Sequence, residues 1–168
     1  MMAAAWSMPV EFTPPRLAVV IDKSTWTREL IEASGCLALN VPCRAQTDLT
    51  WTVGSVSGID EAVGAAGGKF ARYGIGFKDS PSLGKPLVDG SVAWLECRVL
   101  PEPHTQQAYD TFFVEVVAAW ADERVFRDGR WHFDEAPEAL RPIHHVGGGV
   151  FTVSGPTASA RMMPARGQ

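Results

Sequence analysis

Short apolar runs, each broken by proline, glycine or charge, are the main pattern in the first part of the chain. Leu17–Ile21 is such a run and predicts a strand, because it is too short for a helix and ends at charged residues. Apolar positions then change to helical spacing over Arg28–Ser34, with Thr27 as the expected N-cap and Gly35 as the stop. Leu37–Val41 predicts the next strand. The pattern therefore predicts strand, helix and strand in quick succession.

The rest of the chain favours strands over helices. Glycines crowd residues 52–77, so long regular elements are not expected there and only a short helix is predicted near Lys69–Tyr73. Asp128-Gly129 predicts a hairpin turn. Strands are predicted at Val92–Leu100, at Thr111–Trp120 and at His144–Val153, the last of them interrupted by three glycines. Several short strands with few helices favour a closed or partly open β-barrel over alternating βαβ units.

The junction between the first strand and the helix is the strongest candidate for a binding site. Backbone N–H groups at a helix N-terminus lack partners within the helix and lie at the positive end of its dipole, so they can hold an anion. Ser24, Thr25 and Thr27 add hydroxyl donors at this point. We interpret the junction as a phosphate clamp, although the same hydroxyls also suit a plain helix cap without a ligand.

Composition narrows the class of protein. With 168 residues and 46% hydrophobic content, the chain fits one domain with a substantial core. Its net charge of −4, with scattered Lys and Arg, argues against a nucleic-acid partner. No apolar stretch is long enough to span a membrane, and Met1–Trp6 lacks the features of a signal peptide, so we expect a cytoplasmic protein. Cys36, Cys43 and Cys97 are interpreted as buried small hydrophobes rather than a disulfide framework.

Familiar catalytic and nucleotide-binding motifs are absent or incomplete in the sequence. Gly64–Phe70 is one residue shorter than a P-loop, and no Ser or Thr follows its lysine. Gly54–Gly58 has Val56 where a nucleophile elbow needs serine, and no Gly-x-Gly-x-x-Gly occurs. His144 and His145 are adjacent, and because neighbouring residues of a strand point to opposite faces, they do not predict a shared metal site.

A series of short motifs runs in a characteristic order through the chain up to about Gly155. The matching stretches are Ala-Ala-Trp-Ser-Met-Pro at 4–9, Pro14-Pro15, Val20-Ile21, Ser24 with Thr27, Leu39-Asn40-Val41-Pro42, Ser57-Gly58, Lys69-Phe70, Lys85-Pro86-Leu87-Val88, Leu95-Glu96-Cys97 and the late His-His-Val-Gly-Gly-Gly-Val-Phe run. In this order and spacing, the sequence resembles the flavin reductase-like proteins with an FMN-binding split barrel. The resemblance implies a mainly β domain with a few short helices over residues 1–155. The composition of residues 156–168, with Pro, Ala, Ser, Arg and two Met, predicts a flexible tail.

The resemblance also implies a homodimer that binds FMN near the subunit interface. The residues expected to line the flavin are Ala4, Ala5, Trp6, Ser7 and Met8. Those expected at the phosphate end are Asp22, Lys23, Ser24, Thr25 and Thr27, with Asn40 nearby. The residue types suit these roles, because small side chains let backbone amides approach the ring, and a cation and hydroxyls complement a phosphate.

The activity implied by the resemblance is that of an NAD(P)H-dependent flavin reductase. NADH or NADPH would deliver a hydride to bound FMN, which needs no side-chain acid or base, and His145 is a candidate contact for the nicotinamide or the acceptor. One alternative is a flavoredoxin-like protein that transfers electrons without oxidising NAD(P)H itself. Another is a truncated, dimeric β-domain without flavin. A redox protein or a monooxygenase is a possible partner.

The chain departs from that family at its N-terminus and after Gly58. Family members usually carry another N-terminal segment, including a strand, before the Ala-Ala-Trp region, whereas this sequence begins there. The barrel is therefore predicted to lack its first strand, and a start codon assigned too late is the explanation we favour. Where the family often has Ser-Gly-Arg-Asp, Ile59 follows Gly58, so a nucleotide-holding arginine is not expected at this position.

Overall fold

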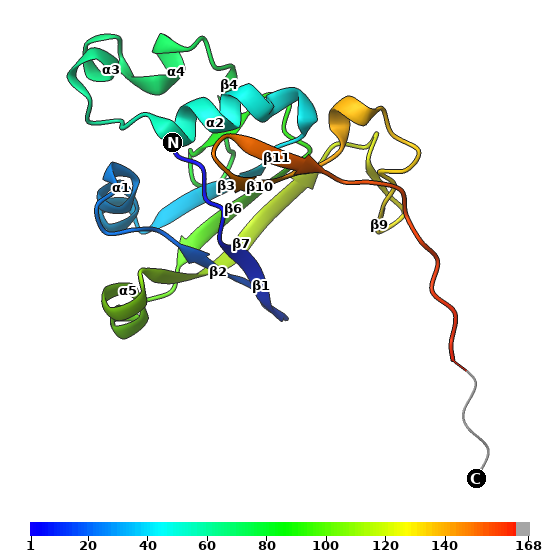
Figure 1. Ribbon diagram of the computed structural model, residues 1–168. Coiled ribbons are helices and arrows are strands. Elements are labelled where there is room, and N and C mark those ends of the chain that lie inside the picture. Colours follow the sequence, from blue (N-terminus) through cyan, green and yellow to red (C-terminus); the bar gives the residue numbers. More distant parts are fainter. Residues whose placement is uncertain (164–168) are drawn as a thin grey trace.

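The largest element of the molecule is a five-stranded antiparallel sheet with the strand order β1-β2-β7-β6-β3 (Figure 1). The computed structural model describes the backbone of residues 1–163 and the side chains of these residues except 61 and 62. The five strands are β1 (Ser7–Phe12), β2 (Pro15–Val20), β3 (Cys36–Val41), β6 (Ala93–Val99) and β7 (Thr111–Ala121). In the part of the chain described, β1 and β3 are its free edges, so this sheet is open.

Small hairpins and short helices complete the fold. The hairpins pair β4 (Phe77–Asp79) with β5 (Pro86–Val88), β8 (Phe126–Arg127) with β9 (Arg130–Trp131), and β10 (Ile143–Gly147) with β11 (Val150–Val153). The α-helices are α1 (Trp26–Ser34), α2 (Thr47–Ser55), α3 (Glu61–Ala65), α4 (Gly68–Arg72) and α5 (Pro103–Tyr109). Short 3-10 turns lie at Arg44–Gln46 and Glu138–Leu140. In Figure 1, α2, α3 and α4 lie together at one end of the central sheet, and the N-terminus lies beside α2. The prediction of a mainly β fold with a few short helices is confirmed.

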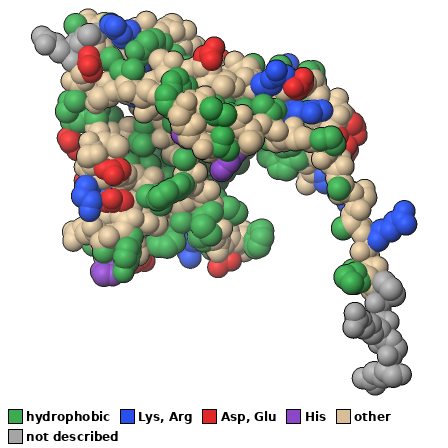
Figure 2. All heavy atoms as spheres, in the orientation of Figure 1, with side chains coloured by type: hydrophobic (Ala, Val, Ile, Leu, Met, Phe, Trp, Pro, Cys, Tyr) green, Lys and Arg blue, Asp and Glu red, His purple; other side chains and the backbone are tan. Residues whose placement is uncertain are grey.

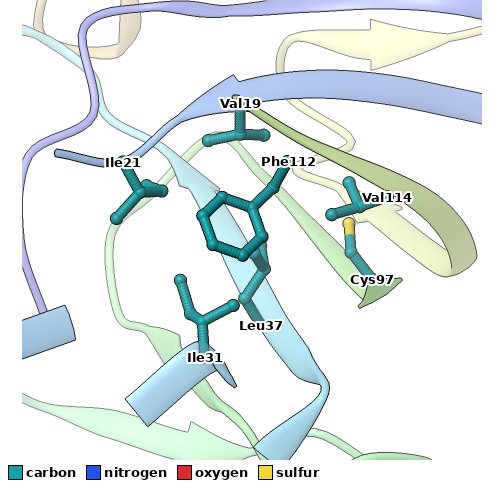
Figure 3. Close-up of a cluster of buried hydrophobic side chains, with 7 residues drawn as sticks. All are labelled: Val19, Ile21, Ile31, Leu37, Cys97, Phe112 and Val114. Carbon is teal, nitrogen blue, oxygen red and sulfur yellow. The ribbon is translucent and has the colours of Figure 1, made fainter. Parts of the chain in front are cut away.

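The main hydrophobic core lies between the central sheet and α1. Phe112 and Val114 are two residues apart on β7 and therefore point to the same face of the sheet. Val19 on β2 lies directly opposite Phe112. Figure 3 shows the Phe112 ring in the middle of this cluster, with Ile31 of α1 and Leu37 of β3 facing it. Burying side chains of this size stabilises the fold by about 1.5 to 3 kcal/mol each. This core therefore fixes α1 against β2, β3 and β7.

The cysteines largely behave as the sequence predicts. Cys43 and Cys97 are fully buried, which confirms the interpretation for both. Burial, together with the neighbouring Glu96 carboxylate, raises the pKa of the Cys97 thiol to about 12. Cys97 is therefore a neutral part of the core at physiological pH. Cys36 is only half-buried and lies in the wall of the cavity described below.

Most of the predicted strands are confirmed within one or two residues, and so is the turn at Asp128-Gly129. That turn joins β8 to β9, and both of its residues have positive φ, 52° for Asp128 and 71° for Gly129, as this type of tight hairpin requires. Gly35 ends α1 in the left-handed conformation, as expected. The predicted N-cap at Thr27 is wrong. Thr25 is the N-cap, because its hydroxyl accepts the N–H of Arg28 and the helix begins at Trp26.

The glycine-rich parts of the chain are only partly as predicted. The short helix expected near Lys69–Tyr73 is confirmed as α4, at Gly68–Arg72. Helix α2 at residues 47–55 and helix α3 were not predicted. A Cβ at Gly54 would lie 3.0 Å from the side chain of Ala3, so this glycine serves close packing rather than a turn. The expected strand at His144–Val153 is a hairpin, because Gly147, Gly148 and Gly149 all have positive φ and reverse the chain between β10 and β11.

Strand β1 and helix α5 were not predicted. All residues of β1 are exposed, so its sequence carries no buried face, and α5 buries none of its residues and begins at Pro103. Of the expected C-terminal tail, residues 156–163 contain no helix or strand, and residues 164–168 lie outside the described residues. A search of the described residues for a helix long and apolar enough to cross a membrane finds none.

Candidate functional site

A cavity of about 760 Å³ lies where the N-terminal segment, α1, β3, α2 and the β10–β11 hairpin meet. Its inner wall is apolar and includes Val19, Ile21, Ile31 and Leu37, the same residues that form part of the core. Cavities that bind small molecules or cofactors commonly have volumes of about 300 to 1,000 Å³ and apolar walls with a few polar groups. The size and lining of this cavity fit that class.

The polar side chains of the cavity come from several elements and are mostly uncharged. They are Thr27, Ser34, Asn40, Gln46, Thr50, Lys85, Ser91, His144 and His145. Among the described residues that line the cavity, Lys85 is the one lysine or arginine, and no aspartate or glutamate takes part. The wall therefore offers hydroxyl and amide groups around a single permanent positive charge.

Five of the residues predicted from the sequence line this cavity. They are Ala4, Ala5, Thr27, Asn40 and His145. The alanines belong to the N-terminal segment that precedes β1, and Thr27 lies in the first turn of α1. The sequence therefore identified residues from four separate segments that the fold brings to one place.

The strand-to-helix junction itself does not reach the cavity. The Asp22 carboxylate accepts hydrogen bonds from both the N–H and the hydroxyl of Ser24, at 2.7 and 2.6 Å. These bonds hold the pKa of Asp22 below its usual value. The Thr25 hydroxyl donates to the Asp22 carbonyl and also caps α1. The hydroxyls expected to hold a phosphate at Ser24 and Thr25 are thus bonded within their own turn.

Lys23 is directed toward α5. Its ammonium lies 3.4 Å from the Asp110 carboxylate and donates to the Gln107 carbonyl. Asp110 is also paired with the buried guanidinium of Arg28, at 2.8 Å. The charged residues around the start of α1 therefore connect that helix to α5. Asp22, Lys23, Ser24 and Thr25 do not line the cavity.

The remaining predicted residues at the N-terminus lie outside the cavity too. Trp6 is 73% exposed, and its carbonyl accepts the N–H of Val20 beside β2. Ser7 and Met8 belong to the exposed edge strand β1. The structure therefore divides the predicted run, because Ala4 and Ala5 line the cavity and the next three residues do not.

Asn40 has a structural task at the cavity wall. Its amide oxygen accepts the N–H of Val88 at 2.8 Å, and its amide nitrogen donates to the Pro86 carbonyl. These bonds join the end of β3 to β5, which follows Lys85 directly. Asn40 thereby helps to fix the position of the cavity's lysine.

The loop that carries Lys85 is also held in place by hydrogen bonds, one of them to the buried carboxylate of Glu96. The N–H of Lys85 donates to the Ser80 hydroxyl, and the fully buried Glu96 accepts the N–H of Leu83 at 2.7 Å. Burial by itself raises the pKa of Glu96, but hydrogen bonds from Ser80, Leu83 and Ser82 outweigh it and hold the pKa below its ordinary value. Sequence reasoning matched Lys85 and Glu96 only as family motifs and assigned neither to the site.

A second buried charge holds the N-terminal segment. The Lys69 ammonium donates to the carbonyls of Met1 and Val53, at 2.9 and 2.7 Å. Lys69 is 7% exposed, and this burial lowers its pKa. Because Met1 and Val53 both line the cavity, Lys69 positions two parts of its wall at once.

An aromatic cluster missed by the sequence analysis lies at the exposed side of the cavity. The ring of His145 lies 5.8 Å from that of Trp51 and 5.0 Å from that of Phe151, measured between centroids. All three residues line the cavity, and Trp51 is 44% exposed. His144 lines the cavity as well. Both adjacent histidines therefore border the same cavity, although neighbouring residues of a strand were expected to point to opposite faces.

The structure is that of a small, mainly β domain with a largely apolar cavity that carries a few polar groups. The family of this domain is shown by sequence. The flavin reductase like domain matches residues 1–141, and this chain belongs to that family.

Relatives are found in bacteria and archaea. The uncharacterized protein YddH of Escherichia coli K12 is 54% identical over 160 residues, which are 95% of this chain and 80% of YddH. A protein of Archaeoglobus fulgidus is 30% identical over 129 residues, 77% of this chain and 68% of that protein.

Solved structures share the fold. The FMN-binding domain of a flavin reductases-like enzyme from Shewanella baltica OS155 has a TM-score of 0.89 and 44% identity, covering 95% of this chain and 81% of that one. Flavoredoxin of Desulfovibrio vulgaris (Miyazaki F) has a TM-score of 0.78 and 23% identity, covering 95% and 80%. Nitrilotriacetate monooxygenase component B of Bacillus cereus has a TM-score of 0.71 and 15% identity, covering 94% and 78%. The last two show the fold alone.

Proposed function

We propose that this protein is an FMN-dependent oxidoreductase in which NADH or NADPH reduces FMN held in the cavity. The observation that carries the proposal is the cavity of about 760 Å³, which gathers four residues expected at the FMN site from the sequence alone, Ala4, Ala5, Thr27 and Asn40. The Shewanella baltica domain, which is described as FMN-binding, supports it through 44% identity over 95% of the chain.

The residues of the wall fit this cofactor. The apolar side chains suit the faces of an isoalloxazine ring, and Ala4 and Ala5 are small enough for the backbone to approach its edge. Lys85 and the Thr27 hydroxyl are the kinds of donor that bind a phosphate group, because a charged donor and a neutral one both form strong bonds to its oxygens. The clamp is thus proposed in the cavity wall and not in the turn at Asp22.

Bound FMN supplies the group that accepts a hydride. The chain's own residues have the tasks of binding, orienting and excluding water. Lys69 and Asn40 hold the N-terminal segment and the β5 edge in place, and the apolar wall lowers the local dielectric around the ring. His145, in the wall on β10, is the candidate contact for the nicotinamide or the acceptor.

A second function is favoured by the charge of the wall. A nicotinamide dinucleotide brings a pyrophosphate in addition to the phosphate of FMN, yet Lys85 is the one lysine or arginine among the described lining residues. This supports a flavoredoxin-like protein in which a redox protein or a monooxygenase partner, rather than NAD(P)H, exchanges electrons with FMN.

We also propose that two copies of the chain associate through β1. Within the described chain this strand is a free edge of the sheet. Met8 and Phe12 on β1, and Trp6 just before it, expose 59%, 93% and 73% of their surface. Figure 2 shows hydrophobic side chains gathered over the region of β1. An exposed apolar edge strand is a ready site for pairing with another copy.

The two functions are separated by adding FMN to purified protein and removing free flavin by gel filtration. Oxidation of NADH or NADPH by the yellow protein, faster than by the same amount of free FMN, supports the reductase. Retained FMN that a reduced ferredoxin-type donor bleaches quickly, and NAD(P)H only slowly, supports the electron-transfer protein. A colourless protein at this stage contradicts both and supports a β-domain without flavin.

A further inference from the structure

We propose that Trp51, His145 and Phe151 form a binding site for an uncharged, planar ring, such as a quinone, that accepts electrons from the cofactor. The inference rests on the proposed function and names the class of its electron acceptor. It is drawn from the aromatic cluster at the exposed side of the cavity, from the small number of charged side chains among the described lining residues, and from the way the β10–β11 hairpin packs on Trp51.

The rings of the cluster are tilted against one another rather than stacked. The ring of His145 is tilted by 39° to that of Trp51 and by 47° to that of Phe151. A tilted pair leaves more of each ring uncovered than a face-to-face stack does. Trp51 is 44% exposed and His145 is also exposed, although both line the cavity. An aromatic ring that enters from solvent can therefore stack on this cluster.

The hairpin is held on Trp51 by a close approach of backbone. A Cβ at Gly149 would lie 3.3 Å from the indole, and Gly149 has a φ of 78°. Glycine therefore lets the turn of the hairpin rest on the ring. Residues more than ninety positions apart in the sequence are brought together in this way, which argues for an assembled site rather than scattered surface aromatics.

The chemistry of the wall selects an uncharged ligand. Lys85 is the one charged lysine or arginine among the described residues of the wall, and it is proposed to serve the FMN phosphate. A ligand with several phosphates finds no further lysine or arginine among the described residues of the wall, whereas a neutral ring loses little solvation on entering an apolar, aromatic site. A quinone held there would take up two electrons and two protons to become a hydroquinone, and FMN, when bound and reduced, would supply them.

The test uses FMN-loaded protein reduced with dithionite, so that it does not depend on NAD(P)H. Menadione, an uncharged naphthoquinone, is the probe, and ferricyanide, a small inorganic anion, is the reference acceptor. In the variant W51L, the menadione concentration for half-maximal reoxidation should rise about 3- to 10-fold, with ferricyanide reoxidation unchanged. W51F should restore most of the affinity, and F151L should show the same selective loss if W51L does not fold.

W120L is the matched control, because Trp120 is 37% exposed on β7 and does not line the cavity. It should leave menadione binding unchanged. Equilibrium titration of oxidised holoprotein with menadione gives a second readout that involves no turnover. Equal menadione affinity in W51L and wild type overturns the proposal, and so does an equal loss of FMN affinity, which would place the cluster in the flavin site.

The same variants distinguish failure of the proposed function, FMN binding, from failure of the proposed ring site. If the wild-type protein binds no FMN, the proposed function fails, and menadione quenching of indole fluorescence in the flavin-free protein still tests the cluster. Quenching that W51L removes and W120L keeps supports the ring site in that case. Quenching that is the same in both variants overturns it.

Discussion

Ser24 and Thr27 are close in sequence, yet their hydroxyls serve different purposes. Ser24 bonds to the Asp22 carboxylate within its own turn, whereas Thr27 lines the cavity. The sequence offers both as phosphate ligands, because each is a hydroxyl near a helix start. Which of the two lines the cavity depends on where the fold places the start of α1, and this cannot be read from the sequence.

The variants T27V and S24A test this difference. T27V should weaken FMN binding by about 1 to 2 kcal/mol, because a hydrogen bond to a charged group is lost without changing the volume of the side chain. S24A should leave FMN affinity within about 2-fold, since it removes only a bond inside the turn. Fluorescence titration of FMN measures both. Equal losses in the two variants would restore the turn at Asp22 as the phosphate clamp.

Glu96 makes the stability of the protein depend on pH in the acid range. Its pKa is lower in the folded protein than the ordinary value of 4.5, because hydrogen bonding to the carboxylate, including the N–H of Leu83, outweighs the opposing effect of burial. A lowered pKa means that the stabilisation is present above pH 4.5 and is lost as the pH falls through the folded value. The variant E96Q should therefore be less stable than wild type by about 1 to 3 kcal/mol at neutral pH.

Urea denaturation of both proteins between pH 7 and pH 3 checks the prediction for Glu96. Asp22 and Asp122 also have lowered pKa values and affect both proteins alike, so the difference between the curves isolates Glu96. The gap in unfolding free energy should narrow as the pH falls below 4.5. A gap that stays constant over this range contradicts the role given to the carboxylate.

A site residue could be predicted from the sequence where it belongs to a short motif that indicates a flavin site. Ala4, Ala5 and Thr27 belong to motifs whose order indicates a flavin site, and the structure brings them to one cavity. Trp51 carries no such local signal, because its ring approaches His145 only when α2 and the β10–β11 hairpin pack together. Phe151 belongs to the late family motif, but the sequence did not assign it to the site. Contacts of this kind depend on the fold and not on any short motif.

At the scale of elements, strand β1 has an apolar surface and no neighbour on its outer edge within the described chain. The alternation that predicts most strands depends on one buried face. β1 has none, which explains why it was missed. If β1 packs against a second copy of the chain, its apolar side chains are buried in the dimer although they are exposed in the single chain.

The variant F12E tests β1 as the surface of association. Wild type should sediment at twice the chain mass of 18.2 kDa, and F12E should shift toward the monomer because it places a charge on the apolar edge. M162E is the control, since Met162 is 96% exposed outside the sheet and should not change the mass. Wild-type protein that sediments as a monomer, or an F12E protein that stays dimeric, contradicts this assignment.

The elements of the central sheet were predictable because their patterns are strong. The sequences of β2, β3, β6 and β7 are apolar runs that end at proline, glycine or charged residues. The folded structure keeps these local preferences. Helix α2 was missed because Gly54 argues locally against a helix, while its close approach to Ala3 explains the glycine. The glycines of residues 147–149 likewise mark a reversal of the chain, which is easily confused with a strand interruption.

At the scale of the whole molecule, the cavity is a product of distant segments. The N-terminal segment, α1, β3, α2, the loop before β5 and the last hairpin each contribute to its wall. Buried groups on separate elements hold these parts together, with Lys69 on α4 bonded to Met1 and Val53, and Asn40 on β3 bonded to Val88. The cavity therefore forms only when these segments fold together.

The central claim is that this cavity binds FMN, and a fluorescence titration of FMN with wild type and the variant K85Q tests it most directly. The wild-type protein should quench FMN at micromolar concentrations and stay yellow through gel filtration. K85Q should bind about 10- to 100-fold more weakly, because it removes the one lysine or arginine among the described residues of the wall. Failure of the wild-type protein to bind FMN, or equal binding by K85Q, would contradict the account.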